Sequence, residues 1–187
     1  MTEGKSRLAG TPTTNIRLIP AAREQEPILA NLLELYIHDF SEFHPVDLDQ
    51  AGRFGYKHLP DYWSEPGLHP FLITVDEKLA GFVLVRKVRA LSSADRTVDD
   101  PVWDIAEFFI VRARRRQGAG LAAAHQVWNL FRGPWHVRVM HFNRSALHFW
   151  QRAIDTFAGH PVDPASIERD GKTWAVFTFE SRAADSI

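Results

Sequence analysis

The sequence predicts a single α/β (α+β) domain with a central mixed, mostly antiparallel sheet of about seven strands flanked by helices. The chain has 187 residues, a length that suits one domain. Short stretches with alternating apolar residues predict strands, and longer stretches with apolar residues at helical spacing predict helices. They follow one another as strand, helix, several antiparallel strands and then strand-helix-strand-helix-strand. This order is typical of a mixed-sheet domain.

The first half of the chain starts with a polar stretch that we expect to form a mobile tail over residues 1–13. The domain itself is expected to span residues 14–181. Its first elements are a strand over residues 15–19, a helix over 27–40, a loop rich in Pro, Gly, Asp and His over 41–70, a hairpin over 70–88 that turns at Asp76 and Glu77, and a polar loop over 89–101.

The second half alternates strands and helices before a short tail over residues 182–187. Gly133 and Pro134 are expected to stop the first of its helices, and Asp170 and Gly171 to form a turn. The expected elements are a strand over residues 102–111, a helix over 121–131, a strand over 135–142, a helix over 143–157 and a strand over 173–180.

Composition excludes several classes of protein. The formal net charge of -1 argues against a surface that attracts nucleic acid or lipid as a whole, so we expect neither as a partner. Cysteine is absent, which rules out disulfides, zinc-thiolate sites and thiol nucleophiles. The histidines show no metal-binding spacing, so no metal is expected. No apolar run reaches the roughly 18 residues of a membrane span. A cytoplasmic location is compatible with these features.

One short stretch, "RRRQGAG" from Arg114 to Gly120, lies between a predicted buried strand and a helix. Backbone N-H groups at a helix N-terminus bind anions, and glycines allow a ligand to approach closely. Arg115 and Arg116 would add paired donors for phosphate oxygens. A solvated basic turn and a nucleic-acid patch are the alternatives. The stretch is neither a Walker loop nor the dinucleotide-binding fingerprint, because the required residues and spacing are missing.

Two motifs resemble those of the GNAT superfamily of acyl-CoA-dependent N-acyltransferases. The first is Arg or Gln, two residues, Gly, one residue, Gly or Ala, which residues 115–120 match. The second is the pattern formed here by Asn143, Ala146, Phe149 and Trp150. The order of elements from residue 15 to 180 is also similar, and the chain resembles a bacterial subset of the superfamily whose acceptor is unassigned.

The resemblance implies acetyl-CoA as cosubstrate, bound in a V-shaped opening between the strands that end near Val111 and begin near Trp135. Pantetheine would bond to the first of these strands, pyrophosphate would rest on the amides of the glycine turn, and Asn143 would hold the pantetheine arm. Asn143 is equally suited to cap the helix that follows. The implied cofactor-binding residues are Phe109, Ile110, Val111, Arg115, Arg116, Gln117, Gly118, Ala119, Gly120, Leu121 and Asn143.

The resemblance also implies direct attack of an amine on the thioester, with Glu107 as general base and a backbone N-H near Phe109 as oxyanion donor. A half-buried carboxylate paired with an arginine is the alternative for Glu107. Relatives commonly protonate the leaving thiolate with a tyrosine, where this chain has Trp150. Water, His148 or Tyr36 could replace it, or the thiolate could leave unaided.

The implied acceptor wall lies on the first helix and the loop after it. Tyr36, His38 and Asp39 are its candidate residues, with a solvated helix end as the alternative. The predicted function is an acetyl-CoA-dependent N-acetyltransferase acting on a small-molecule or peptide amine. A non-catalytic acyl-CoA-binding or regulatory domain on the same fold is the alternative. A homodimer is compatible with the sequence, which identifies neither the acceptor nor the acyl chain length.

Overall fold

The computed structural model describes residues 14–89, 101–169 and 171–182. The expected tail over residues 1–13 lies outside these residues, as do most of the C-terminal tail and most of the polar loop over 89–101. No helix in the described parts of the chain is long and apolar enough to span a membrane.

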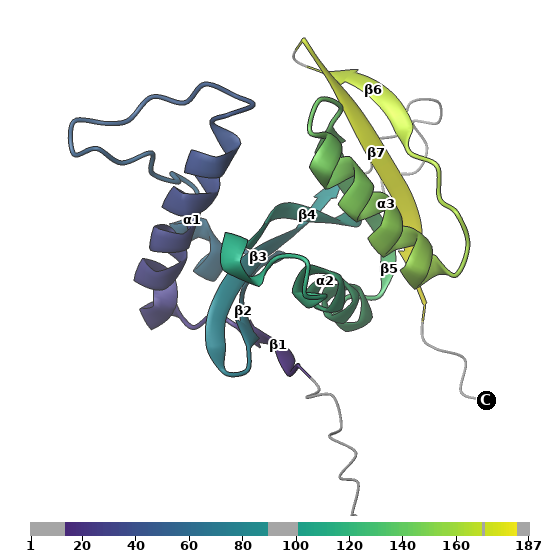
Figure 1. Ribbon diagram of the computed structural model, residues 1–187, viewed down its shortest axis with the longest axis horizontal. Coiled ribbons are helices and arrows are strands. Elements are labelled where there is room, and N and C mark those ends of the chain that lie inside the picture. Colours follow the sequence, from purple (N-terminus) through teal and green to yellow (C-terminus); the bar gives the residue numbers. More distant parts are fainter. Residues whose placement is uncertain (1–13, 90–100, 170, 183–187) are drawn as a thin grey trace, which may run out of the picture.

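The described residues form a seven-stranded sheet in the order β1-β2-β3-β4-β5-β7-β6 (Figure 1). All neighbouring strands are antiparallel except β4 and β5, which are parallel. This confirms the predicted fold class. The strands are β1 Ile16–Pro20, β2 Leu68–Val75, β3 Lys78–Arg89, β4 Pro101–Ile110, β5 Gly133–Met140, β6 Ala165–Arg169 and β7 Lys172–Ser181. The helices are α1 Glu26–Phe40, α2 Ala119–Leu130 and α3 Arg144–Ala158, with 3-10 turns η1 Arg23–Gln25, η2 Pro60–Trp63 and η3 Arg112–Arg114.

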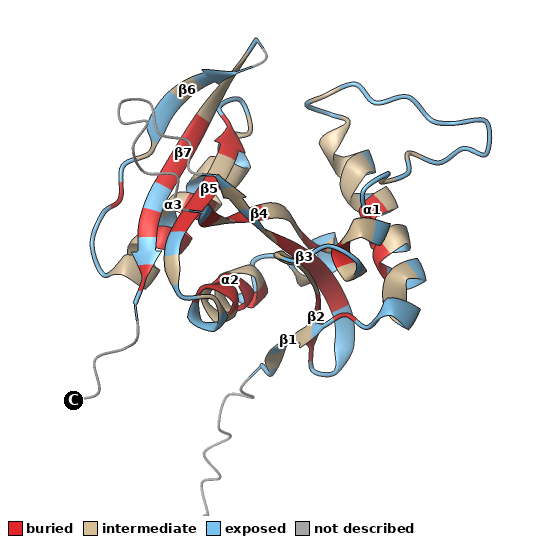
Figure 2. Ribbon diagram, turned by 180° about the vertical axis from the view of Figure 1, so that it is seen from behind, coloured by how far each residue is buried: buried red, intermediate tan, exposed pale blue. Residues whose placement is uncertain are grey.

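Helices cover the sheet on both faces. On one face α1 buries Leu29, Leu32 and Leu33, which follow helical spacing, against β2, β3 and β4. On the other face α2 packs on β1 and β4 and α3 packs on β5 and β7, and Trp128 is fully buried there. Figure 2 shows the buried residues along β3, β4, β5 and β7, whereas β6 is largely exposed.

The two parallel strands separate soon after they meet. β4 and β5 pair only at Trp103 with Trp135 and at Asp104 with His136. Both strands continue past these pairs, to Ile110 and Met140, without further pairing between them. A V-shaped opening therefore lies between the C-terminal parts of β4 and β5, as predicted, and α2 begins at its side.

A β-bulge in β4 decides which way the strand's side chains point. Val85 pairs with Ile105 and Leu84 with Glu107, so Ala106 is an extra residue without a partner on β3. Regular alternation would turn Glu107 toward α2. The bulge instead turns it to the face of α1.

Several element boundaries differ from the sequence prediction. The helix α2 ends at Leu130, and Gly133 and Pro134, expected to stop it, already belong to β5. The strand β2 begins at Leu68, inside the expected loop. The strand β6 was not placed, because most of its residues are exposed and it has no apolar alternation.

Candidate functional site

Glu107 lies half-buried on the α1 face of the sheet, between two tyrosines from different elements. The Tyr56 hydroxyl, in the loop after α1, donates a hydrogen bond to Glu107 Oε1 at 3.1 Å. Tyr36, on α1, lies beside the same carboxylate and packs edge-on against Phe109. Burial raises the pKa of Glu107, although the two hydroxyls partly offset this effect. The carboxylate is therefore a stronger base than an exposed glutamate.

Both tyrosines keep their protons at neutral pH. Burial raises the pKa of Tyr36 well above its ordinary value, and the nearby charge of Glu107 raises it further. The pKa of Tyr56 is also raised, for the same two reasons in the same order. A phenol with a raised pKa remains a hydrogen-bond donor to Glu107 but is a weak acid.

A charged cluster lies on the same face at the base of the opening. Asp104 of β4 is fully buried, and Arg86 of β3 places its Nε 2.7 Å from Asp104 Oδ2. Arg138 of β5 binds the same carboxylate from the other side, with Nε 3.0 Å from Oδ1 and Nη2 2.8 Å from Oδ2. The sequence reasoning missed this cluster and Tyr56. Asp104 could have been recognised as a candidate, because it is a charged residue within an otherwise apolar strand.

The turn from β4 to α2 presents unpaired backbone donors. Helix geometry leaves the N-H groups of the first residues of α2, which begins at Ala119, without intrahelical partners. Gly118 precedes them with a φ of 80°, in the left-handed region where glycine is favoured, and a Cβ there would meet open space. Gly120 has another role, because a Cβ on it would lie 3.1 Å from the Phe149 ring. Gly118 thus shapes the turn, and Gly120 allows α2 to pack against α3.

The arginine run is partly engaged within the protein. Arg115 Nη2 lies 2.7 Å from Asp39 Oδ2, and its Nε donates to the Ile110 carbonyl at 2.7 Å. Arg112 Nη2 lies 2.7 Å from the other oxygen of Asp39. Burial acts to raise the pKa of Asp39, but the hydrogen bonds from both arginines outweigh it and lower the pKa. The structure therefore pairs two predicted site residues, Asp39 and Arg115, with each other, while Arg116 is exposed.

The backbone of β4 faces the opening at alternate residues. The Val111 N-H bonds to the Ala80 carbonyl at 2.9 Å, and the Phe109 carbonyl lies against Gly81, so both point toward β3. Alternation along the strand then turns the backbone groups of Phe108 and Ile110 to the opening. A ligand between β4 and β5 would meet the backbone groups of Phe108 and the N-H of Ile110, because the Ile110 carbonyl already accepts from Arg115.

The remaining candidates fall at different places. Asn143 caps α3, accepting a hydrogen bond from the Ala146 N-H at 3.0 Å. Trp150 is buried in the core against Phe108 and Trp128. His148 lies on α3 in a depression lined by polar residues of that helix, and His38 is exposed on α1. Neither histidine joins the group around Glu107.

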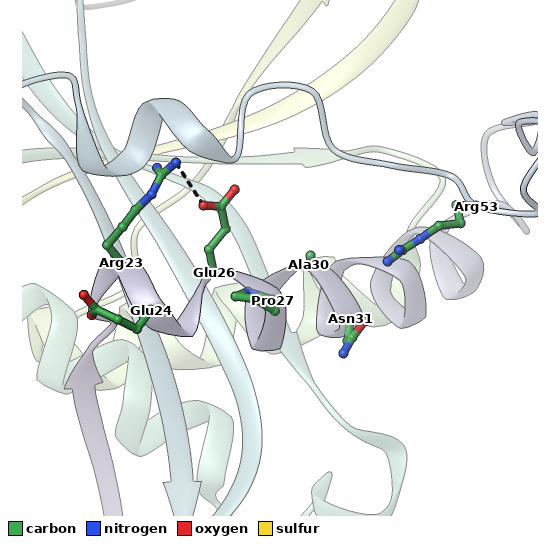
Figure 3. A pocket seen from close by; sticks show the side chains of 7 residues that line it. All are labelled: Arg23, Glu24, Glu26, Pro27, Ala30, Asn31 and Arg53. Carbon is green, nitrogen blue, oxygen red and sulfur yellow. Dashed lines mark ion pairs between the residues drawn. The ribbon is translucent and has the colours of Figure 1, made fainter.

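An open surface depression lies along α1 and η1 (Figure 3). Its arginines are already engaged, since Arg23 pairs with Glu26 at 3.1 Å and Arg53 with Glu34 at 3.6 Å. It contains none of the residues around Glu107, so it is not the candidate site. The lining residues are Arg23, Glu24, Glu26, Pro27, Ala30, Asn31 and Arg53.

A mixed sheet that splays at its parallel pair, with a helix N-terminus at the opening and a half-buried carboxylate beside it, is the architecture of an acyl-CoA-dependent acyltransferase. Residues 29–154 match the family model described as "Acetyltransferase (GNAT) family". The chain belongs to this family of acyltransferases.

Solved structures share the fold. Arabidopsis thaliana NAA60 in complex with acetyl-CoA aligns with a TM-score of 0.57 at 14% identity over 89% of this chain and 98% of its own. The ribosomal-protein-S18-alanine N-acetyltransferase of Escherichia coli gives 0.58 at 13% identity over 92% and 99%. An aminoglycoside acetyltransferase from an uncultured soil metagenomic sample, with sisomicin, gives 0.55 at 16% over 75% and 88%. No curated protein sequence matches the chain significantly.

Proposed function

We propose that the protein transfers an acetyl group from acetyl-CoA to a primary amine by direct attack of the amine on the thioester. The observation that carries this proposal is the position of Glu107. The β-bulge turns this carboxylate to the α1 face, where burial raises its pKa. It lies on the strand whose unpaired edge lines the opening. In this position Glu107 would act as a base beside the expected thioester.

The cofactor would occupy the opening and the turn at its side. Pyrophosphate would accept hydrogen bonds from backbone N-H groups between Gln117 and Leu121, at the positive end of the α2 dipole. Arg116 is exposed and would meet phosphate, while Arg115 holds the turn against Asp39. Pantetheine would add to the free edge of β4 through the backbone groups of Phe108 and the N-H of Ile110. Asn143, whose side-chain oxygen caps α3, would use its amide N-H₂ to hold the pantetheine arm.

The residues around Glu107 would perform the proton transfer. An alkyl ammonium, with a pKa of about 10.4, must lose a proton before it attacks, and Glu107 takes that proton directly or through water. The hydrogen bond from Tyr56 would hold the carboxylate in position, with the Tyr36 hydroxyl beside it. The oxyanion of the tetrahedral intermediate would be stabilised by a β4 N-H that faces the opening, next to Phe109 in the sequence.

The leaving thiolate would depart without a side-chain acid. Trp150 occupies the usual tyrosine position and is buried, and the raised pKa of Tyr36 makes its hydroxyl a weak acid. An ordinary thiol has a pKa of about 8.5, so its thiolate is a reasonable leaving group at neutral pH. The buried Trp150 is also the observation that favours the second candidate, a non-catalytic acyl-CoA-binding domain.

Thermal melting with CoA and acetyl-CoA, followed by thiol release against a panel of amines, tests the proposal. A ligand that binds only the folded state stabilises it by about 2.7 kcal/mol at 100 times its dissociation constant. We expect a higher Tm with both cofactors and amine-dependent thiol release. A higher Tm without release for any amine would favour the non-catalytic domain, and an unchanged Tm at millimolar cofactor would contradict both.

A matched pair of glycine variants tests the turn. Gly118 and Gly159 both have positive φ, and a Cβ on either would meet open space. Alanine at each should therefore cost a similar 1–2 kcal/mol of folding free energy, roughly the penalty of the left-handed conformation. We expect only Gly118→Ala to weaken acetyl-CoA binding, by about tenfold or more in calorimetric titration, because only this glycine orients the α2 amides. Equal acetyl-CoA affinity in the two variants would refute this cofactor site.

A further inference from the structure

The cluster of Arg86, Asp104 and Arg138 lies on a face of the sheet that α1 covers only in part. Alternation along β5 places Arg138 opposite Val137 and Val139, which belong to the core under α2 and α3. Arg138 therefore lies on the α1 face. The apolar cluster beneath α1 contains no residue of β5 or β7, so within the described residues no helix covers these strands on that side.

The cluster has more positive than negative charge. Asp104 is 0% exposed, whereas the side chains of Arg86 and Arg138 are 35% and 21% exposed. A guanidinium has five N-H donors, and the two groups spend only part of theirs on one carboxylate. Among the described residues, neither guanidinium has another acceptor. The cluster therefore keeps one surplus positive charge and several unused N-H donors on the α1 face of the sheet.

This surplus charge lies close to the proposed base. Asp104 and Glu107 lie on the same face of β4 because of the bulge, about 7–10 Å apart along the strand. The positive charge of Arg86 acts on Glu107. It lowers the pKa of this carboxyl group and so partly offsets the increase caused by burial. A molecule in the opening would thus meet a carboxylate at one point and a pair of guanidiniums at another.

We propose that the acceptor is a zwitterion whose ammonium group binds at Glu107 and whose anionic group binds Arg138 and Arg86. This assignment rests on the proposed acetyltransferase function and names the substrate class. Arginine binds carboxylate and phosphate through paired, charge-assisted hydrogen bonds, so either group meets the requirement. A polycationic amine would instead place a second ammonium group against the guanidiniums, which repel it.

Acceptor pairs that differ only in the anion test the proposal through thiol release from acetyl-CoA. Glycine, β-alanine and γ-aminobutyrate would be compared with their amides, and phosphoethanolamine with ethanolamine, with spermidine as the polycation. We expect kcat/KM to be at least about tenfold higher for the anionic member of at least one pair, since charge-assisted bonds discriminate by that much. The three amino acids also differ in the distance between their ammonium and carboxylate groups, so their relative kcat/KM values indicate which separation the site prefers. Preference for spermidine or for the uncharged members would overturn the proposal.

Arg138→Gln separates recognition from folding, because Arg86 still pairs with Asp104 in this variant. We expect it to lower kcat/KM for the preferred anionic acceptor about tenfold or more and to leave its uncharged partner within about twofold. Arg138→Lys should restore part of the loss, and Arg152→Gln, exposed on α3, should have no effect. An equal loss for both partners would indicate a structural role and overturn the proposal.

A binding measurement distinguishes failure of this inference from failure of the proposed function. If acetyl-CoA binds but no amine causes thiol release, the proposed acetyl transfer has failed. The anion site is then tested separately, by measuring the Tm of the protein-CoA complex with each amine. The anionic amines should raise this Tm in the unaltered protein and leave it unchanged in Arg138→Gln. Chloride at the same concentration is the control for a general effect of salt. If none of these amines raises the Tm at tens of millimolar, the anion site is overturned as well.

Discussion

Replacing Glu107 with Gln should lower kcat/KM for acetyl transfer by about 10²–10⁴-fold at neutral pH, the range a general base contributes. The amide has nearly the same shape and can still accept the hydrogen bond from Tyr56, but it cannot take a proton from the ammonium. Acetyl-CoA should bind with unchanged affinity, because Glu107 does not contribute to the α2 turn. Steady-state thiol release and calorimetric titration of acetyl-CoA measure the two quantities.

The pH dependence of the two proteins should differ in shape. A base acts only when deprotonated, and burial raises the pKa of Glu107, so activity should fall with decreasing pH at values above the ordinary glutamate range. The unaltered protein should reach a plateau between that pKa and the pKa of the amine. The Gln variant depends on amine already deprotonated in solution, so its kcat/KM should rise tenfold per pH unit up to about 10.4.

Glu24→Gln is the matched control, since Glu24 is exposed on η1, outside the site. It should retain the activity and pH profile of the unaltered protein. A Glu107→Gln variant with activity within about threefold, and the same plateau, would remove Glu107 as the base.

The features of the fold and site that depend on short stretches of chain were predictable from the sequence. The helix and strand order follows from local periodicity, and the turn before α2 follows from "RRRQGAG", because the left-handed φ of Gly118 requires a glycine locally. Glu107 was named through resemblance alone. Its environment was not predictable, because the β-bulge at Ala106 that turns it toward α1 leaves no mark in the apolar pattern.

Other parts of the site depend on contacts between distant residues. Arg86, Asp104 and Arg138 come from three strands and meet only once the sheet forms. Tyr56 reaches Glu107 from a loop that has no periodic signal. Asp39 and Arg115 were each assigned to a ligand, but they lie far apart in the sequence and pair with each other. A short stretch of sequence can identify such residues as candidates, but it does not show which distant residues they contact.

Asp104→Ala should cost about 3 kcal/mol of unfolding free energy, at the lower end of the range for breaking a buried ion pair. Asp104 is fully buried between two guanidiniums, and its removal leaves both without their carboxylate while bringing like charges together. We choose the lower end because both arginines are partly solvated. Urea-induced unfolding, with the m-value checked for constancy, measures the change.

Two comparisons make this result specific to the buried charges. Glu180 forms an exposed pair with Arg182, so Glu180→Ala should change stability by less than about 1 kcal/mol. Replacing all three members, as Arg86→Met, Asp104→Leu and Arg138→Met together, should recover most of the loss, because apolar groups of similar volume avoid the cost of burying charge. A stable triple variant that still binds acetyl-CoA but no longer prefers anionic acceptors would show that the cluster serves recognition rather than stability. A loss below about 1 kcal/mol in Asp104→Ala would mean instead that the two guanidiniums are solvated well enough to need no partner.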